Sequence, residues 1–258
     1  MSATKYLNLV QGILEKIKTK EMKRIRAAAK IMAESISNDG RVYMFGSGHS
    51  VIPVLDIFPR YGSFVGFFPL YDPRLMWWNV IGPGGAREVL WLERQEGYAR
   101  VFLQSYPLEK RDAMLVFSHG GLNAAPIEMA LEAKARGLKV ITVSSHANVR
   151  IARRSHSSGK VLSEVADVAI DNCVPPEDSL VDVGQLEKVA AGSTVAAVSI
   201  AMSLVAETAL VLAKKRKVPP TFVSPNVHGV PKDHMAGVYQ AFTEFYYKRP
   251  FNKKGQTG

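Results

Sequence analysis

The loop Ser118-His119-Gly120-Gly121 places a hydroxyl, an imidazole and two adjacent glycines directly after an apolar run, Met114–Phe117. Two adjacent glycines permit positive φ angles and let a ligand approach the backbone closely. Asn123 can cap the helix that follows, and the free N–H groups and dipole of a helix N-terminus favour an anion such as phosphate. The loop is therefore a candidate anion-binding site. The alternative is a tight turn with no further function.

A second apolar run, Lys139–Val143, follows this loop and ends at Ser144 and Ser145. Apolar residues recur at helical spacing between the two runs, which predicts a strand–helix–strand unit. Ligands of open α/β sheets bind at the carboxyl ends of the strands. We therefore expect the hydroxyls of Ser118, Ser144 and Ser145 to share that edge.

A similar loop, Gly46–Ser50, follows the predicted first strand Arg41–Phe45. It has neither the GxGxxG spacing of a dinucleotide site nor the GK[ST] of a Walker A loop. It is a candidate for contacts to a smaller ligand, through Gly46, Ser47, Gly48 and Ser50. In the helix that follows, Asp56 and Arg60 are spaced for a surface ion pair.

The overall composition is that of an ordinary globular protein, with 47% hydrophobic and 22% charged residues among 258. The single cysteine, Cys173, excludes an internal disulfide and a cysteine-based zinc site, and we expect a cytoplasmic protein. The histidines show no metal-ligand spacing, so we expect neither a metal nor a cofactor. The net charge of +10 comes without a recognisable nucleic-acid motif, which favours attraction of anionic metabolites over nucleic acid.

Residues 190–213 are almost free of charge and are followed by Lys-Lys-Arg-Lys, as in a membrane span. Small residues dominate this stretch, and Glu207 within a span would cost about 2.5 to 3.5 kcal/mol. We therefore expect a buried helix and no membrane partner. Ser193 and Thr194, at its start, can cap the helix or reach a ligand.

Strand and helix patterns alternate along the chain, which predicts an α/β protein, a three-layer αβα sandwich around a parallel sheet. We expect a single domain with three parts. A helical arm of one or two helices spans residues 1–38, the main domain spans 39–235, and a last helix and tail span 236–258. Residues 88–103 predict one amphipathic helix and residues 172–182 an acidic loop.

Several motifs resemble the SIS (sugar isomerase) domain, and within it the UPF0309 group. The matching segments appear in the family's order over most of the chain: Phe45–Ser50 (FGSGHS), Leu92–Ala99 (LERQEGYA), Ser118–Ala133, Ala166–Pro176, Gly192–Ala196 (GSTVA) and Pro220–Val227. The resemblance implies a flavodoxin-like parallel sheet and binding of a sugar or sugar phosphate. It also implies a homodimer or homotetramer.

The resemblance assigns roles to three segments. Hydroxyls of the serine-rich loop, here Ser118–Asn123, hold the phosphate in SIS domains. Ser193 and Thr194 close the site, and the loop Gly46–Ser50 holds sugar hydroxyls. This chain departs from the related SNSG and STSG loops, because Gly120 replaces a hydroxyl and His119 adds an imidazole. A sulfonate or carboxylate is therefore an alternative to the phosphate.

Aldose–ketose isomerisation needs a base that moves a proton between two carbons and an acid that opens the sugar ring. Asp56 is the first candidate base, because its helix position matches an acidic position of the family. Glu207 is the second, because apolar surroundings raise a carboxyl pKa. His49 and His119 lie on the predicted site loops as candidate acids, and His228 could reach a neighbouring site.

Three functions remain open on the sequence: an isomerase acting on a phosphorylated sugar, a related lyase, etherase or deglycase, and a non-catalytic sugar-phosphate sensor. The first two begin with deprotonation beside a carbonyl. The chain shows no DNA-binding module, which disfavours a transcriptional sensor.

Overall fold

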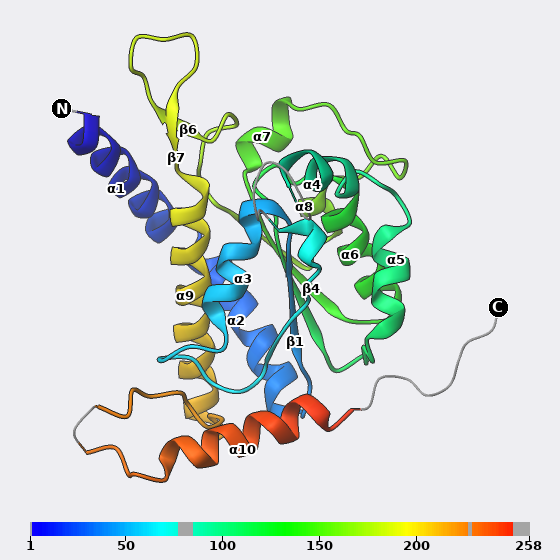
Figure 1. The fold of residues 1–258 in the computed structure, drawn as a ribbon, viewed down its shortest axis with the longest axis vertical. Coiled ribbons are helices and arrows are strands. Elements are labelled where there is room, and N and C mark those ends of the chain that lie inside the picture. Colours follow the sequence, from blue (N-terminus) through cyan, green and yellow to red (C-terminus); the bar gives the residue numbers. More distant parts are fainter. Residues whose placement is uncertain (1, 77–84, 227–228, 250–258) are drawn as a thin grey trace.

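The computed structural model describes residues 2–76, 85–226 and 229–249. A parallel sheet with strand order β2-β1-β3-β4-β5 forms its centre (Figure 1). The strands are β1 (Val42–Gly46), β2 (Phe67–Pro69), β3 (Ala113–Phe117), β4 (Lys139–Ser144) and β5 (Val168–Asp171). All residues of β1 and β3 are buried, as expected for parallel strands covered on both faces. The predicted α/β fold with a flavodoxin-like sheet is confirmed.

Helices cover both faces of the sheet and complete three layers (Figure 1). One face carries α2 (Met22–Ser37), α3 (Val51–Ile57) and α9 (Ser193–Lys214); the other carries α4 (Ala86–Leu92), α5 (Tyr98–Phe102), α6 (Ala124–Ala135) and α8 (Leu162–Val165). Side chains of each strand alternate between the two cores: Met44 faces the first and Tyr43 the second. The short helix α7 (His146–Ile151) follows β4.

The N-terminal residues form two helices that lie in different environments. α2 buries Ala28, Ala29 and Met32 and packs against α9 within the helical layer. α1 (Ser2–Lys20) is largely exposed and extends beside the hairpin of β6 (Ser179–Val181) and β7 (Val189–Ala191) (Figure 1). The Tyr6 hydroxyl donates to the Ala191 carbonyl at 3.0 Å. Of the helical arm predicted for residues 1–38, therefore, α1 extends from the domain, whereas α2 belongs to its helical layer.

α9 is the apolar segment that the sequence also allowed as a membrane span. Its mean hydropathy reaches 2.1 over an 18-residue window, and 44% of that window is buried. Ala196, Ile200 and Leu204 lie in the core between α2 and α3, where small neighbouring residues permit close helix packing. The predicted buried helix is confirmed for the side of α9 that carries Ala196, Ile200 and Leu204.

Two local predictions were wrong. Residues 88–103 form two helices, α4 and α5, because the chain turns between them and Gly97 has a left-handed φ of 91°. Glycine takes this conformation without the steric cost that a side chain would add. Residues 172–182, expected as a loop, end in strand β6, which pairs antiparallel with β7.

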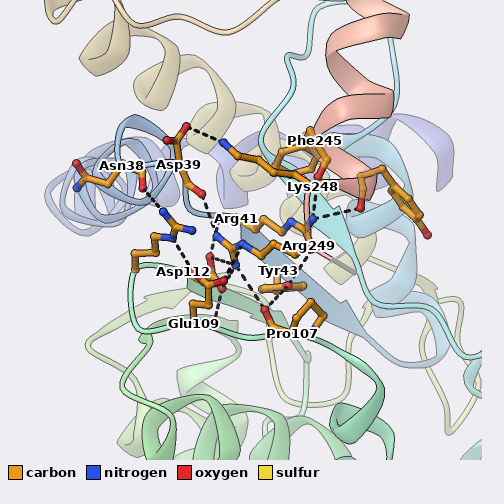
Figure 2. A network of polar contacts seen from close by, with 12 residues as sticks. Asn38, Asp39, Arg41, Tyr43, Pro107, Glu109, Asp112, Phe245, Lys248 and Arg249 are labelled. Atoms are coloured by element: carbon orange, nitrogen blue, oxygen red, sulfur yellow. Dashed lines mark hydrogen bonds and ion pairs between the residues drawn. The ribbon is translucent and has the colours of Figure 1, made fainter. Parts of the chain in front are cut away.

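The last helix, α10 (His234–Tyr247), is fixed near the amino-terminal ends of β1 and β3 (Figure 2). The buried Arg249 guanidinium donates to both carboxylate oxygens of Asp112, at 2.9 and 2.7 Å. The Arg41 guanidinium donates to the Phe245 carbonyl at 2.8 Å and lies 5.0 Å from the centre of the Phe68 ring. Charged hydrogen bonds and cation–π contacts thus tie α10 to the sheet at the end opposite the predicted site.

Candidate functional site

The sheet reverses its winding direction between β1 and β3. β1 is flanked by β2 on one side and by β3 on the other, and Gly46 pairs with Phe117 at the carboxyl ends. In open α/β sheets such a switch point leaves a crevice in which ligands bind. The two loops singled out in the sequence, residues 46–50 and 118–123, begin at this point.

The loop after β1 is compact and requires its first glycine. A Cβ on Gly46 would lie 2.0 Å from the Ser50 carbonyl oxygen, which is an impossible contact. The chain therefore folds back closely, through the 3₁₀ turn Gly48–Ser50, into α3. This turn brings His49 and Ser50 to the crevice.

The loop after β3 is held by its own serine. The Gly121 N–H donates to Ser118 Oγ at 3.2 Å, and Gly121 has a left-handed φ of 65°. Gly120 differs from Gly121: its φ is not in the left-handed region, and within 4 Å a Cβ would meet just the Asn148 side-chain nitrogen, at 3.7 Å. Backbone geometry thus requires glycine at position 121, whereas position 120 has room for a side chain.

Both ring nitrogens of His119 bond within the chain. Nδ1 lies 3.1 Å from the Asn172 amide nitrogen, and Nε2 lies 3.3 Å from the Pro176 carbonyl oxygen. The Val174 N–H donates to Asn172 Oδ1 at 3.1 Å, so the amide nitrogen is the donor toward His119. We assign His119 as the neutral imidazole with its proton on Nε2, the form that satisfies all three bonds. His119 therefore connects the loops after β3 and β5, and its Nδ1 accepts a hydrogen bond, as it does in the neutral ring.

Polar residues from four segments converge on a small pocket at the switch point, on the α9 side of the sheet. The polar residues that line it are His49, Ser50, Ser118, His119, Asn172, Ser193 and Thr194, and Phe117, Val143 and Ala197 form its apolar part. The cavity volume is about 20 Å³, room for about one water-sized group. No lysine or arginine occurs among the lining residues of the described chain. Hydroxyl and N–H groups would therefore have to hold an anion here.

The start of α9 already carries a carboxylate from its own chain. Asp178 Oδ1 accepts the N–H groups of Gly192 at 3.1 Å and Ser193 at 2.7 Å, and Oδ2 accepts the Ser193 hydroxyl at 2.7 Å. Asp178 thus satisfies part of the helix N-terminus and orients the Ser193 side chain. Its negative charge also lowers the attraction of this helix end for a second anion.

Comparison with known proteins identifies the architecture. Residues 5–145 match the SIS domain family. This chain belongs to the SIS domain family. It is 34% identical to a UPF0309 protein of Thermoanaerobacter pseudethanolicus over 89% of this chain and 93% of the relative, and 30% identical to a UPF0309 protein of Streptomyces coelicolor over 96% and 98%.

Solved structures agree on the fold of this SIS domain. The phosphoheptose isomerase of Neisseria gonorrhoeae superimposes with a TM-score of 0.52 and 13% identity, over 80% of this chain and 97% of that one. A phosphoheptose isomerase from Francisella tularensis gives a TM-score of 0.50 and 15% identity, over 80% and 95%. At these identities the likeness shows a shared fold.

Not all predicted residues of the SIS domain line the pocket. Ser145 Oγ donates to the Val174 carbonyl at 2.7 Å and accepts the Asn148 N–H at 3.2 Å, so it caps α7. Ser144 Oγ is buried with no hydrogen-bond partner in the described structure, and lies under Gly121. Gly46 and Gly48 shape their loop through the backbone.

The two predicted carboxylate bases lie elsewhere. Asp56 is ion-paired with Arg60, the alternative that their spacing offered, and is not among the residues that line the pocket. Glu207 lies 3.4 Å from Arg26. It is fourteen positions after Ser193 in α9, about 21 Å along the helix axis. His228 lies outside the described residues.

Glu93 was missed in the sequence, yet it connects both site loops. Ser47 Oγ donates to Glu93 Oε2 at 2.7 Å, and Asn123 Nδ2 donates to Glu93 Oε1 at 2.7 Å. Asn123 occupies the N-cap position of α6, but its side chain bonds Glu93 and does not cap the helix. Burial raises the pKa of Glu93, and the Ser47 hydrogen bond and the charge of Arg94 partly oppose that rise. The LERQEGYA motif contained this residue, but its partners are distant in the sequence.

The donor set does not indicate a metal centre. Within the described ranges, no group of three or more histidine, cysteine, aspartate or glutamate side chains is placed to hold a metal ion. The site as described offers hydroxyls, backbone N–H groups, one exposed imidazole on the loop after β1, and one buried carboxylate.

Proposed function

We propose that this SIS domain protein binds a sugar phosphate at the β1/β3 switch point and interconverts its aldose and ketose forms. The observation that supports the proposal is the convergence of polar groups from four separate segments on one pocket at this point. A small number of polar groups that converge in a concave site, at the switch point of an α/β sheet, is typical of ligand-binding sites.

In this proposal the anionic group enters the pocket and the sugar lies over the strand ends. Ser118 and Thr194 offer hydroxyls to the pocket from two segments, the loop after β3 and the start of α9. The pocket volume of about 20 Å³ requires the lining segments to move apart as the ligand enters. The net charge of +10 attracts an anionic substrate at longer range.

The reaction requires a proton to leave the carbon beside the carbonyl and the carbonyl oxygen to gain one. In the second half of the reaction the base protonates the neighbouring carbon of the enediol and the oxygen on the first carbon loses its proton, so the carbonyl and the hydroxyl exchange positions. His49, exposed at the pocket, is the proposed acid for the carbonyl oxygen and for ring opening.

A thermal-shift titration tests binding first. The ligands are glucose 6-phosphate, fructose 6-phosphate, arabinose 5-phosphate and sedoheptulose 7-phosphate, each with its unphosphorylated parent. A ligand that binds the native state raises Tm by mass action. We expect a phosphosugar to raise Tm and its unphosphorylated parent to leave Tm unchanged. We expect Thr194→Val to lower the affinity for the phosphosugar, taken from the titration, about tenfold or more.

The enzyme assay follows with the ligand that gives the largest shift. Appearance of the isomeric sugar phosphate supports the isomerase. Binding with no turnover would favour a sensor, and loss of the substituent beside the enediol would favour a lyase or deglycase. Equal shifts from phosphosugars and their parents would contradict a pocket for an anionic group.

A further inference from the structure

Glu93 is a buried carboxylate at the junction of the two site loops. It is 7% exposed, and its two oxygens accept from Ser47 and Asn123, which belong to the loops after β1 and β3. Ser47 lies in the same turn as the pocket residue Ser50, whose N–H donates to the Ser47 carbonyl at 3.1 Å. The carboxylate therefore lies against the turn that carries Ser50, at the strand ends beside the pocket, although Glu93 is not itself one of the residues that line the pocket.

The surroundings of Glu93 are those of a proton carrier more than those of a structural ion pair. In the part of the chain that the structure describes, its carboxylate bonds two neutral groups, a hydroxyl and an amide. An arginine or lysine partner would hold the carboxylate ionised, whereas neutral donors in a buried place leave both protonation states accessible. The carboxylate has about four acceptor positions, and the two hydrogen bonds use two of them.

We propose that Glu93 is the catalytic base that carries the proton between the two carbons of the bound sugar. The assignment rests on the proposed isomerase function. The bond between C2 and its hydrogen breaks, the proton goes to a Glu93 oxygen, and the electron pair forms the C1–C2 double bond of the enediol. The carbonyl oxygen takes a proton from the acid. Glu93 then returns its proton to C1, while the hydroxyl on C2 gives its proton back to the acid and becomes the carbonyl.

Ser47 and Asn123 are positioning residues in this assignment. One hydrogen bond from each loop fixes the plane of the carboxylate, so movement of either loop is transmitted to the base. The Ser47 bond also lowers the pKa of Glu93 against the effect of burial. Both loops thus set the orientation of the carboxylate, and the loop after β1 also lowers its pKa through Ser47.

Glu93→Gln separates a catalytic role from a structural one. The glutamine Oε1 can accept from Asn123 Nδ2, and its Nε2 can donate to Ser47 Oγ, because a serine hydroxyl can accept as well as donate. The variant therefore keeps both loop contacts and loses the basic oxygen. Glu132→Gln, a carboxylate on α6 paired with Arg136 at 3.7 Å, is the matched control.

The experiment measures exchange of the sugar C–H with solvent deuterium by NMR, using fructose 6-phosphate and arabinose 5-phosphate as probes. Thermal shifts with the same probes report binding separately. We expect the wild type and Glu132→Gln to incorporate deuterium. Glu93→Gln should bind with an unchanged thermal shift and exchange at least a hundredfold more slowly.

Each outcome decides between the two proposals. Wild-type exchange retained in Glu93→Gln overturns the assignment of Glu93 and leaves the proposed function standing. A wild type that does not exchange, whether or not it binds the probes, overturns the proposed isomerase itself. If Glu93→Gln does not fold, Ser47→Ala replaces it: the loss of the hydroxyl should move the acidic limb of the exchange rate to higher pH. An unmoved limb contradicts the assignment.

Discussion

The side chains of His119 and Asn172 lie 3.1 Å apart, with the amide nitrogen of Asn172 facing Nδ1 of the imidazole. Because the Val174 N–H fixes the Asn172 oxygen, this contact suits a neutral imidazole. The related loops SNSG and STSG lack this imidazole. In the loop of residues 118–121, His119 therefore connects the loops after β3 and β5 and adds no positive charge to the pocket.

His119→Gln tests this role. Glutamine cannot reach Asn172 and Pro176 as the ring does, so two hydrogen bonds are lost and we expect the free energy of unfolding to fall by about 1 to 3 kcal/mol. Affinity for the sugar phosphate should change less than tenfold, because no positive charge is removed. Urea unfolding and thermal-shift titration measure the two effects. A loss of affinity above a hundredfold at unchanged stability would show that His119 binds the anion directly.

Gly120→Ser restores a hydroxyl to the loop. The position lies outside the left-handed φ region and has room for a Cβ, so we expect stability within about 0.5 kcal/mol of the wild type. The added donor should strengthen binding of a sugar phosphate several-fold, as measured by titration calorimetry. Unchanged affinity would indicate that the anion does not approach this loop.

Asp178→Asn changes the charge at the start of α9. The asparagine oxygen can still accept from the Gly192 and Ser193 N–H groups, while the negative charge beside Ser193 is lost. We expect the affinity for an anionic sugar to rise about threefold to tenfold, and the gain to shrink with added salt. An uncharged parent sugar provides the comparison. Unchanged affinity for the phosphosugar would place its anionic group away from α9.

The pKa of Glu93 predicts a pH dependence of stability. Burial, opposed in part by Ser47, raises the pKa above its ordinary 4.5, so the folded protein keeps this proton after the unfolded chain has released it. The stability contribution of Glu93 is therefore full below pH 4.5 and is lost as the pH rises through the folded-state value. Glu93→Gln lacks this loss. Relative to the wild type, the free energy of unfolding of Glu93→Gln should therefore increase as the pH rises from 4.5, and the difference should become constant above the folded-state pKa. Urea unfolding at several pH values measures this difference. A difference that does not change with pH would contradict the raised pKa.

Local sequence patterns were sufficient for the elements of the fold. The apolar run Met114–Phe117 predicted β3, and the small-residue stretch after Ser193 predicted a buried helix, because burial on a sheet leaves a periodic pattern. The break between α4 and α5 was missed because Gly97 is a single residue within an otherwise helical pattern. The hairpin β6/β7 was missed because its strands are short and β7 is exposed.

The site was predicted in part, for a geometric reason. Residues on the two loops could be placed because strand ends share an edge. The role proposed for Glu93 depends on its contacts with Ser47 and Asn123, which are 46 and 30 positions away in the sequence. Asp56 has the right residue type but points to Arg60. Residue type and spacing thus predicted which loops meet at the strand ends, and three-dimensional contacts were needed to propose Glu93 as the base.

The central claim is that an anionic sugar binds between the loops at the β1/β3 switch point. Hydrogen–deuterium exchange of the protein with and without a stabilising sugar phosphate tests it directly. The account predicts added protection of the amides of residues 47–51, 118–123 and 192–196. Protection confined to the basic groove that includes Lys16, Lys20 and Arg150, with no change at these three segments, would contradict it.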